Sequence, residues 1–219
     1  MRVLALDTTT ARGSVALLED GQVAGEVRLV RADGHSRWLL PAVEQLLHQG
    51  SHPPLELDGF AVTTGPGSFT GGRVGMATVQ GLALGTNRTC VGLSALDVLA
   101  SLAGPVEGPV VALMDAWRDE VYACAYDGGR ATGPAGAGPL AGLVPLLPSR
   151  PVFVGDGASK FRDRIAVLWP EARVLEVDLF LAVPLGRLAE RVFREARGTA
   201  PEDLRPLYLR GAVDRAPKP

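Results

Sequence analysis

The sequence predicts an α/β protein of two similar halves, each a mixed β-sheet with helices packed against it. First, an apolar run that ends in aspartate occurs twice, at Asp7 and at Asp115, which are 108 positions apart. Second, each run is followed by a polar turn, another apolar run and an Asp-Gly pair, at Asp20 and at Asp127. Asp-Gly between apolar runs is typical of a two-residue hairpin. Because these features recur in one order at nearly one spacing, we interpret the chain as an internal duplication.

In the first half we expect a three-stranded meander followed by alternating helices and strands. The expected order is strand 3–6, strand 14–19, strand 22–30, helix 36–47, strand 59–63, helix 72–85, strand 89–93 and a further helix. Residues 36–47 carry one broad apolar face at helical spacing, and Pro41 belongs to the first turn or kinks the helix.

The second half repeats this order in shorter form. We expect strands 110–114 and 121–126, then a strand that ends at the turn Gly155-Asp156-Gly157, a helix, strand 173–177 and a last helix. Residues 128–151 are rich in Gly, Pro and Ala, which predicts a loop with one short helical piece in place of the third strand. A boundary at Gly104-Pro105 gives domains 1–104 and 105–219, and the tail of the second is allowed to return to the first.

Two such mixed sheets with helices describe the actin-like ATPase (ribonuclease-H-like) architecture, in which a cleft separates paired domains. Each half places an aspartate at the carboxyl end of its first strand, where anions and metals bind in such sheets. The candidate nucleotide-cleft residues are therefore Asp7, Thr8, Thr9, Gly65, Gly67 and Asp115. A carboxylate beside threonine hydroxyls can hold Mg²⁺ through water. The alternative, that Asp7 is a hydrogen-bonded turn residue, stays open.

The glycine-rich turn "GPGSFTGGRVG" (65–75) matches neither of two known phosphate motifs. In a P-loop, lysine and a hydroxyl residue would stand where Arg73 and Val74 do, and a dinucleotide fingerprint would have glycine in place of Thr70. We therefore expect these glycines to serve the backbone. In the following helix Ala77, Gly81 and Gly85 lie four apart and form a groove, which packs either on the protein's own sheet or on a partner helix.

Composition and the remaining reactive residues narrow the function. The net charge of −2 argues against unaided binding of nucleic acid, and the two cysteines, Cys90 and Cys124, are read as buried free thiols. No signal peptide or membrane-length run is found, so a cytoplasmic protein is expected. His48 and His52 have metal-pair spacing, but Pro53 and its neighbours break the helix that such a pair needs, and His35 is expected at a cap or on the surface.

Six stretches in order resemble the TsaB (YeaZ) family. They are "LALDTTTARGSVAL", "GHSRWLLPAVEQLL", "TTGPGSFTGGRVGMATVQGLALG", "MDAWRDEVYACAYD", "VGDGASKF" and "RPLYLRGAVD", and they extend over nearly the whole chain. The third, of the form GPGSFTGxRxGxxxxQGLALG, is the most specific. Gly72 stands where relatives usually carry a bulkier residue. The resemblance implies the duplicated actin-like fold.

The resemblance also implies a role in tRNA modification. Family members belong to the bacterial machinery that adds threonylcarbamoyl to the tRNA adenosine beside the anticodon. They are non-catalytic paralogues of TsaD, the transferase, and the ATPase TsaE joins the assembly. The metal-binding histidines of TsaD correspond here to Ser94 and Val98, so no metal and no catalytic residue is implied. The chain is therefore expected to need no cofactor of its own. Weak binding of ATP or ADP with Mg²⁺ by the chain stays open.

The resemblance further implies docking on TsaD through helices of the first domain, with tRNA contacted only in the complex. The implied interface residues are Leu39, Val43, Leu46, Arg73, Ala77, Gly81 and Gly85. A homodimer is expected when TsaD is absent. Two alternatives remain: an actin-like kinase or ATPase that uses Asp7 and Asp115 with ATP and Mg²⁺, and a metalloprotease, for which the sequence supplies no ligand set.

Overall fold

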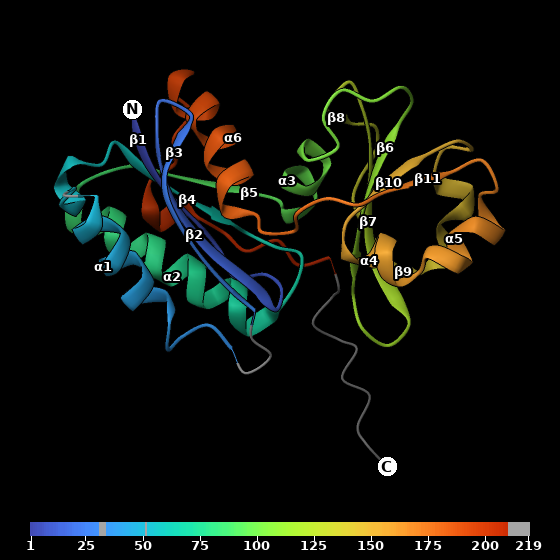
Figure 1. Cartoon of the computed structure of the whole chain (residues 1–219), viewed down its shortest axis with the longest axis horizontal. Coiled ribbons are helices and arrows are strands. Elements are labelled where there is room, and N and C mark those ends of the chain that lie inside the picture. Colours follow the sequence, from blue (N-terminus) through green and yellow to red (C-terminus); the bar gives the residue numbers. More distant parts are fainter. Residues whose placement is uncertain (31–33, 51, 210–219) are drawn as a thin grey trace, which may run out of the picture. The chain divides into compact units, whose positions relative to one another are not determined.

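The computed structural model of the chain describes residues 1–30, 34–50 and 52–209, and these form two compact units (Figure 1). Of the described residues, 1–98 and 178–206 make the first unit, and 99–177 with 207–209 make the second. The first stretch of the first unit ends at residue 98 rather than at the predicted boundary of 104, and residues 178–206 return to that unit, as the prediction allowed for the tail. Of the C-terminal motif 205–214, residues 210–214 lie outside the described residues.

The first unit contains a mixed five-stranded sheet in the order β3-β2-β1-β4-β5. Its strands are β1 Arg2–Asp7, β2 Arg12–Glu19, β3 Gln22–Val30, β4 Gly59–Thr63 and β5 Cys90–Leu93. The first three are antiparallel neighbours, joined through the predicted hairpin at Asp20-Gly21, whereas β4 is parallel to β1 and β5 is parallel to β4. The predicted meander and the mixed sheet are confirmed.

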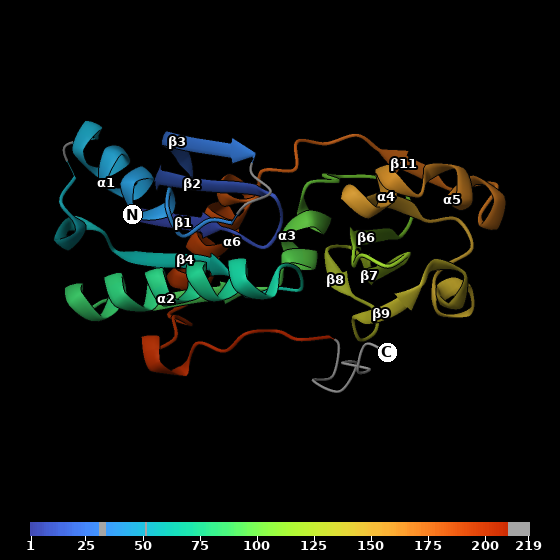
Figure 2. The same cartoon turned by 90° about the horizontal axis from the view of Figure 1, so that it is seen from below.

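Helices cover both faces of this sheet (Figure 2). They are α1 Leu39–Gln49 and α2 Phe69–Thr86 on one face and α6 Ala182–Arg194 on the other, with the short 3-10 helices η1 Pro54–Glu56 and η3 Pro201–Asp203. Successive residues of β2 show the two faces, because Leu17 belongs to the core shared with α1 and α2, while Leu18 contacts Gly186 of α6. The helix α3, Ala95–Ser101, leads from the first unit into the second.

The amphipathic character of α6 explains why the chain returns to the first unit. Its buried residues Ala182, Leu185, Gly186 and Ala189 lie against the sheet. The backbone N–H of Ala182 donates to the buried hydroxyl of Ser14 in β2 (3.0 Å). Without α6, this face of the sheet would expose the apolar side chains Val3 and Ala5, which are completely buried.

The second unit contains a six-stranded sheet in the order β11-β10-β6-β7-β8, with β9 also paired to β7. Its strands are β6 Val110–Asp115, β7 Glu120–Asp127, β8 Arg130–Ala131, β9 Gly136–Pro139, β10 Val152–Val154 and β11 Arg173–Leu175, and its helices are η2 Leu140–Leu146, α4 Asp156–Lys160 and α5 Arg162–Leu168. The short helical piece predicted in 128–151 is present as η2. The prediction that this segment lacks a third strand is wrong, because β8 and β9 pair with β7 and satisfy its backbone groups.

Each unit has its own hydrophobic core. Leu4, Leu17, Phe60 and Val79 are among the buried residues of the first, and Val111, Phe153 and Trp169 are among those of the second. No helix in the described ranges combines the length and the hydropathy that a membrane span requires.

Candidate functional site

The carboxyl of Asp7 is completely buried at the end of β1. Its Oδ1 accepts hydrogen bonds from the Thr9 backbone N–H (3.1 Å), from the Thr9 hydroxyl (2.7 Å) and from the Thr63 hydroxyl (2.5 Å). Its Oδ2 is buried and finds no hydrogen-bond partner in the described part of the chain. Thr63, at the end of the neighbouring β4, is a residue that the sequence reasoning missed, because only the parallel pairing of β1 with β4 brings it close.

Burial raises the pKa of the Asp7 carboxyl, and the hydrogen bonds from Thr63 and Thr9 lower it only in part. A buried acid with one unpartnered oxygen is less costly when neutral, because desolvation penalises the charged form. With no exposed surface, the carboxyl cannot reach Mg²⁺ or its bound waters unless the turn moves. The geometry therefore supports the alternative that Asp7 is a structural turn residue.

The turn after Asp7 is held against the start of α2. The Thr8 hydroxyl donates to the Gly71 carbonyl (2.8 Å), and the Ser68 N–H donates to the Thr9 carbonyl (2.6 Å). Ser68 also caps α2 by accepting the Gly71 N–H (3.1 Å). Two backbone segments that approach this closely leave no room for a side chain between them.

Glycines make that approach possible. A Cβ added to Gly67 would lie 2.2 Å from the Thr9 carbonyl oxygen, and one added to Gly71 would lie 2.1 Å from that of Thr8. A Cβ on Gly75 would lie 2.4 Å from the Thr8 hydroxyl. Of the candidate residues, Thr8, Thr9 and Gly67 are thus brought together by these contacts, and Gly65 has a positive φ of 110° two residues before Gly67. These glycines allow the close approach of two backbone segments, as expected from a turn that matches neither the P-loop nor the dinucleotide motif.

His35 holds the other side of the same turn. Its Nε2 donates to the Thr10 carbonyl (2.7 Å), and its Nδ1 accepts the Trp38 indole N–H (3.0 Å). Because a carbonyl can only accept and an indole N–H can only donate, the ring is the neutral tautomer with its proton on Nε2. His35 is buried, and the N-cap residue of α1 is Trp38, so the predicted place of His35 at a cap or on the surface is wrong.

Asp115, the counterpart of Asp7, lies in the second unit and has a different environment. Its side chain is 20% exposed, and Oδ2 lies 2.8 Å from the Lys160 ammonium. Its Oδ1 accepts the Trp117 N–H (3.0 Å), and its own N–H donates to Asp156 (3.2 Å). Lys160 lies 45 positions from Asp115 in the sequence, so local patterns could not reveal this contact. Asp115 is therefore an accessible, cation-paired carboxylate, whereas Asp7 is neither.

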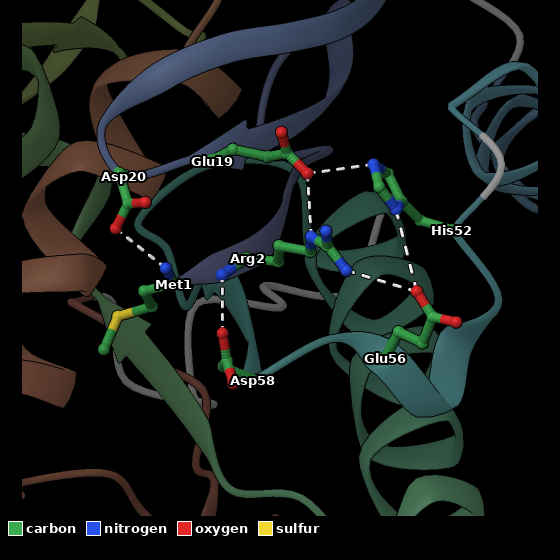
Figure 3. Close-up of polar contacts among 7 residues, drawn as sticks. All are labelled: Met1, Arg2, Glu19, Asp20, His52, Glu56 and Asp58. Carbon is green, nitrogen blue, oxygen red and sulfur yellow. Dashed lines mark hydrogen bonds and ion pairs between the residues drawn. The ribbon is translucent and has the colours of Figure 1, made fainter.

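His48 and His52 do not form a metal pair. His48 is exposed on α1, and the Nε2 of His52 lies 2.9 Å from a carboxylate oxygen of Glu19 (Figure 3). Arg2 bridges the same Glu19 (2.8 Å) and Glu56 (3.2 Å). These side chains join the first strand, the β2–β3 hairpin and η1 as a surface ion-pair network. Within the described ranges no group of three or more His, Cys, Asp or Glu is placed to hold a metal.

The outer face of α2 is exposed. Phe69 is 55% and Leu84 is 63% exposed, and Arg73, Ala77, Gly81 and Gly85 are exposed as well. We call these six residues the α2 outer face. Among the described residues, a Cβ on Gly81 or Gly85 would meet nothing within 4 Å, so packing in this part of the chain does not require either glycine. The Arg73 guanidinium lies over the Phe69 ring, 3.8 Å from its centroid.

The predicted contribution of α1 to this surface is wrong. Leu39, Val43 and Leu46 are only 1%, 2% and 5% exposed, because they pack into the core of the first unit. The apolar stripe of α1 faces its own sheet, and the same side chains are unavailable to a partner.

Two mixed-sheet α/β units, each with a first strand that ends in aspartate at a tight turn, define the actin-like class of ATPases and kinases. An inorganic polyphosphate/ATP-glucomannokinase from an Arthrobacter strain has this fold, with a TM-score of 0.54, 12% identity, and coverage of 89% of this chain and 99% of that one. At that identity the likeness concerns the fold alone.

Closer relatives specify the family. The chain is 34% identical to the tRNA threonylcarbamoyladenosine biosynthesis protein TsaB of Escherichia coli K12 over 97% of this chain and 96% of the relative. The solved structure of YeaZ from Pseudomonas aeruginosa matches with a TM-score of 0.81 and 32% identity, over 95% of this chain and 99% of that one. A family model described as TsaD, tRNA N6-adenosine threonylcarbamoyltransferase, matches residues 23–140. The chain belongs to the TsaB (YeaZ) family.

Proposed function

We propose that this chain is a non-catalytic subunit of the cytoplasmic complex that adds threonylcarbamoyl to the tRNA adenosine beside the anticodon. Support comes from the relatives, among them the E. coli protein named for threonylcarbamoyladenosine biosynthesis. In this proposal a TsaD-type catalytic subunit is the direct partner, a TsaE-type ATPase joins the pair, and the chain needs no cofactor of its own. Without its partner the chain forms a homodimer.

The observation that carries this proposal is the α2 outer face. An exposed helix that combines Phe69 and Leu84 with open glycines presents apolar area and allows another backbone to approach closely. Glycine inside a helix costs about 1 kcal/mol relative to alanine, and no contact with another described residue accounts for Gly81 or Gly85. A partner helix that packs on the α2 outer face would account for both glycines.

A TsaD-type protein is the partner that the family match favours for this face. The TsaD model matches residues 23–140, which contain all of α2, so a TsaD-type chain carries a related segment. Two related helices can pack on each other about a pseudo-twofold axis, as in isologous interfaces. The same geometry permits two copies of this chain to pair when the catalytic subunit is absent.

The positions that would carry the catalytic metal have structural roles instead. Ser94 accepts the Leu96 backbone N–H (3.2 Å) at the start of α3, and Val98 is completely buried. Neither residue can supply the imidazole that a transferase metal site of the TsaD type uses. These roles support a subunit that contributes docking surface rather than chemistry.

The docking proposal is tested by mixing the purified chain with the TsaD-type subunit of the same organism and measuring molar mass by chromatography with light scattering. We expect a complex with the wild-type chain and none with Gly81→Trp, because the indole would occupy the groove. The matched control is Gly133→Trp, at another exposed glycine with open space around its Cβ, in the second unit. Complex formation by both variants alike would refute the α2 outer face as the docking surface.

A second measurement separates the subunit proposal from the kinase alternative, which the fold of the class favours. The isolated chain is assayed for threonylcarbamoyl transfer and for ATP hydrolysis, alone and with the catalytic subunit. We expect transfer only in the mixture. ATP hydrolysis by the chain alone, abolished by Asp115→Asn, would favour the kinase or ATPase, because Asp115 is the accessible aspartate of the pair.

A further inference from the structure

The outward side of α6 carries a row of arginines. Arg187, Arg191 and Arg194 are all exposed and are spaced four and three residues apart, which places them on one side of the helix. The row extends about 10 Å along the helix axis, at about 1.5 Å per residue. The opposite side, with Leu185 and Ala189, is buried against the sheet, so the arginine side is the outward one. We call these three residues the α6 arginine row.

The guanidinium groups of this row are only partly engaged within the chain. Within the described ranges the Arg191 side chain has no hydrogen bond or ion pair, and the Arg187 guanidinium donates only to the Gly21 carbonyl (3.3 Å). Arg194 lies 3.6 Å from Asp20, whose carboxylate also binds the Met1 amine at 2.8 Å (Figure 3). Because Asp20 is shared between two cations, it offsets only part of the positive charge. Five N–H donors on each guanidinium leave capacity for an external anion.

The second carboxylate near the row is already committed inside the protein. The Glu190 side chain is 6% exposed and accepts the Gly21 backbone N–H (2.7 Å), which holds the β2–β3 hairpin against α6. Its distance to the Arg194 guanidinium is 3.7 Å. Farther along the chain Arg197 pairs with Glu195, so that pair adds no net charge. The outward side of α6 therefore stays positive although the whole chain has a net charge of −2.

The chemistry of the row favours a nucleic-acid strand over a protein as its partner. Within the described ranges, α6 exposes no large hydrophobic side chain, in contrast to Phe69 and Leu84 on the α2 outer face. Protein interfaces have an apolar core, whereas interfaces with nucleic acids are more polar and strongly positive. Guanidinium groups match phosphate oxygens in bidentate geometry. A line of them suits the regularly spaced phosphates of one strand.

We infer that the α6 arginine row binds the phosphate backbone of RNA, and specifically of the tRNA that the complex modifies. The choice of tRNA rests on the proposed function. The α6 row and the α2 outer face belong to helices on opposite faces of one sheet, so docking of a protein on α2 leaves α6 uncovered (Figure 2). Phosphate contacts carry no sequence information, so the row contributes affinity and orientation rather than selection of the adenosine.

The inference is tested with the triple variant Arg187→Gln, Arg191→Gln, Arg194→Gln. Glutamine keeps a high helix propensity and an uncharged polar end while it removes the charge. The matched control is Arg130→Gln, Arg150→Gln, Arg162→Gln, which removes three exposed arginines from the second unit and gives the same net charge. Both triple variants are checked for folding by thermal unfolding and for docking by chromatography with light scattering. The assembled complex is then titrated with unmodified tRNA transcript at several salt concentrations.

We expect the α6 triple variant to form the complex normally and to bind the transcript about tenfold more weakly. The slope of log affinity against log salt should fall by about 2 to 3, because each lost phosphate contact removes roughly 0.7 to 0.9 from it. The control triple variant should keep the wild-type affinity and slope. A merely structural role for the arginines would not change the salt slope.

Four results would overturn the inference. Equal affinity and equal slope for the wild type and the α6 triple variant would do so while the proposed function stood, as long as the complex forms. Equal losses in the two triple variants would show a general effect of charge. Loss of a protein subunit from the complex, with tRNA binding intact, would show that the row binds an acidic protein. If no complex forms with the wild-type chain, the proposed function fails, and the isolated chain is titrated instead. Indistinguishable binding by the wild type and the α6 triple variant would then overturn the inference as well.

Discussion

Two faces of the helical segment around α2 use glycine for different reasons. On the inner face Gly67, Gly71 and Gly75 touch the turn after β1, and an added Cβ would lie within 2.1 to 2.4 Å of Thr8 or Thr9 atoms. On the outer face an added Cβ at Gly81 or Gly85 would meet nothing within 4 Å. The inner glycines are explained by the fold of the single chain. The outer ones lower helix stability without any such compensation.

This difference shows that glycines in one glycine-rich stretch can have separate roles, some in folding and others in binding. The inner face packs against the turn after β1. At that turn, buried Asp7 accepts three hydrogen bonds, from the Thr9 N–H, the Thr9 hydroxyl and the Thr63 hydroxyl. The outer face remains available on the surface. In this chain the turn after β1 packs closely against the start of α2, and we propose that the outer side of the same helix serves a partner.

The largest effect is expected at the inner face. Gly71→Ala should lower the free energy of unfolding by about 3 kcal/mol, because the new methyl group would overlap the Thr8 carbonyl oxygen and force the two backbones apart. The matched control is Gly72→Ala, one residue further along α2, where the added Cβ has open space. Urea unfolding of both variants measures the difference. If they were equally stable, the close contact between the turn and α2 would not be a determinant of the fold.

The next prediction concerns Asp7 and pH. Because burial raises its pKa in the folded state, the folded protein holds this proton more tightly than the unfolded chain does. Stability from Asp7 is therefore fully present below the pKa of an ordinary aspartate, and it declines as pH rises through the raised pKa. Asp7→Asn should remove this decline, measured as unfolding free energy across acidic to neutral pH.

Asp115→Asn is the control for that experiment, because it removes a partly exposed carboxylate that is paired with Lys160. The difference between the wild type and each variant isolates one group from all others that titrate. An Asp7→Asn protein that lost stability with rising pH as steeply as the wild type would show that Asp7 is not the buried neutral acid.

The smallest effect is expected at the outer face, with the opposite sign. Gly81→Ala should raise the free energy of unfolding of the isolated chain by about 0.5 to 1 kcal/mol, since alanine favours the helix and the added methyl group meets no neighbour. The same change should weaken docking of the TsaD-type subunit, measured by titration calorimetry. A variant that was stabilised and docked with unchanged affinity would remove the reason we give for this glycine.

Local signals in the sequence predicted much of the fold. The hairpin at Asp20-Gly21 and the strand that ends at Asp7 follow from residue patterns within a few positions. Contacts between distant residues could not be predicted in this way. Thr63 reaches Asp7 only because β4 pairs with β1, and His35 holds Thr10 only because α1 packs on that side of the sheet. In the same way α1 has a clear apolar stripe, but periodicity cannot say whether a stripe faces the protein's own sheet or a partner.

By itself the sequence determined that the chain is a duplicated α/β protein of the TsaB family. It also determined that the glycine-rich turn at residues 65–75 matches neither of the two known phosphate-binding motifs. The tertiary structure decided which of these glycines lie against neighbouring atoms and which face open space. It also decided that Asp7 is buried while Asp115 is accessible, and that residues 178–206 return to the first unit. The physical reason is that propensity and periodicity act along the chain over a few residues. Burial, pKa and exposure, in contrast, depend on which distant segments meet.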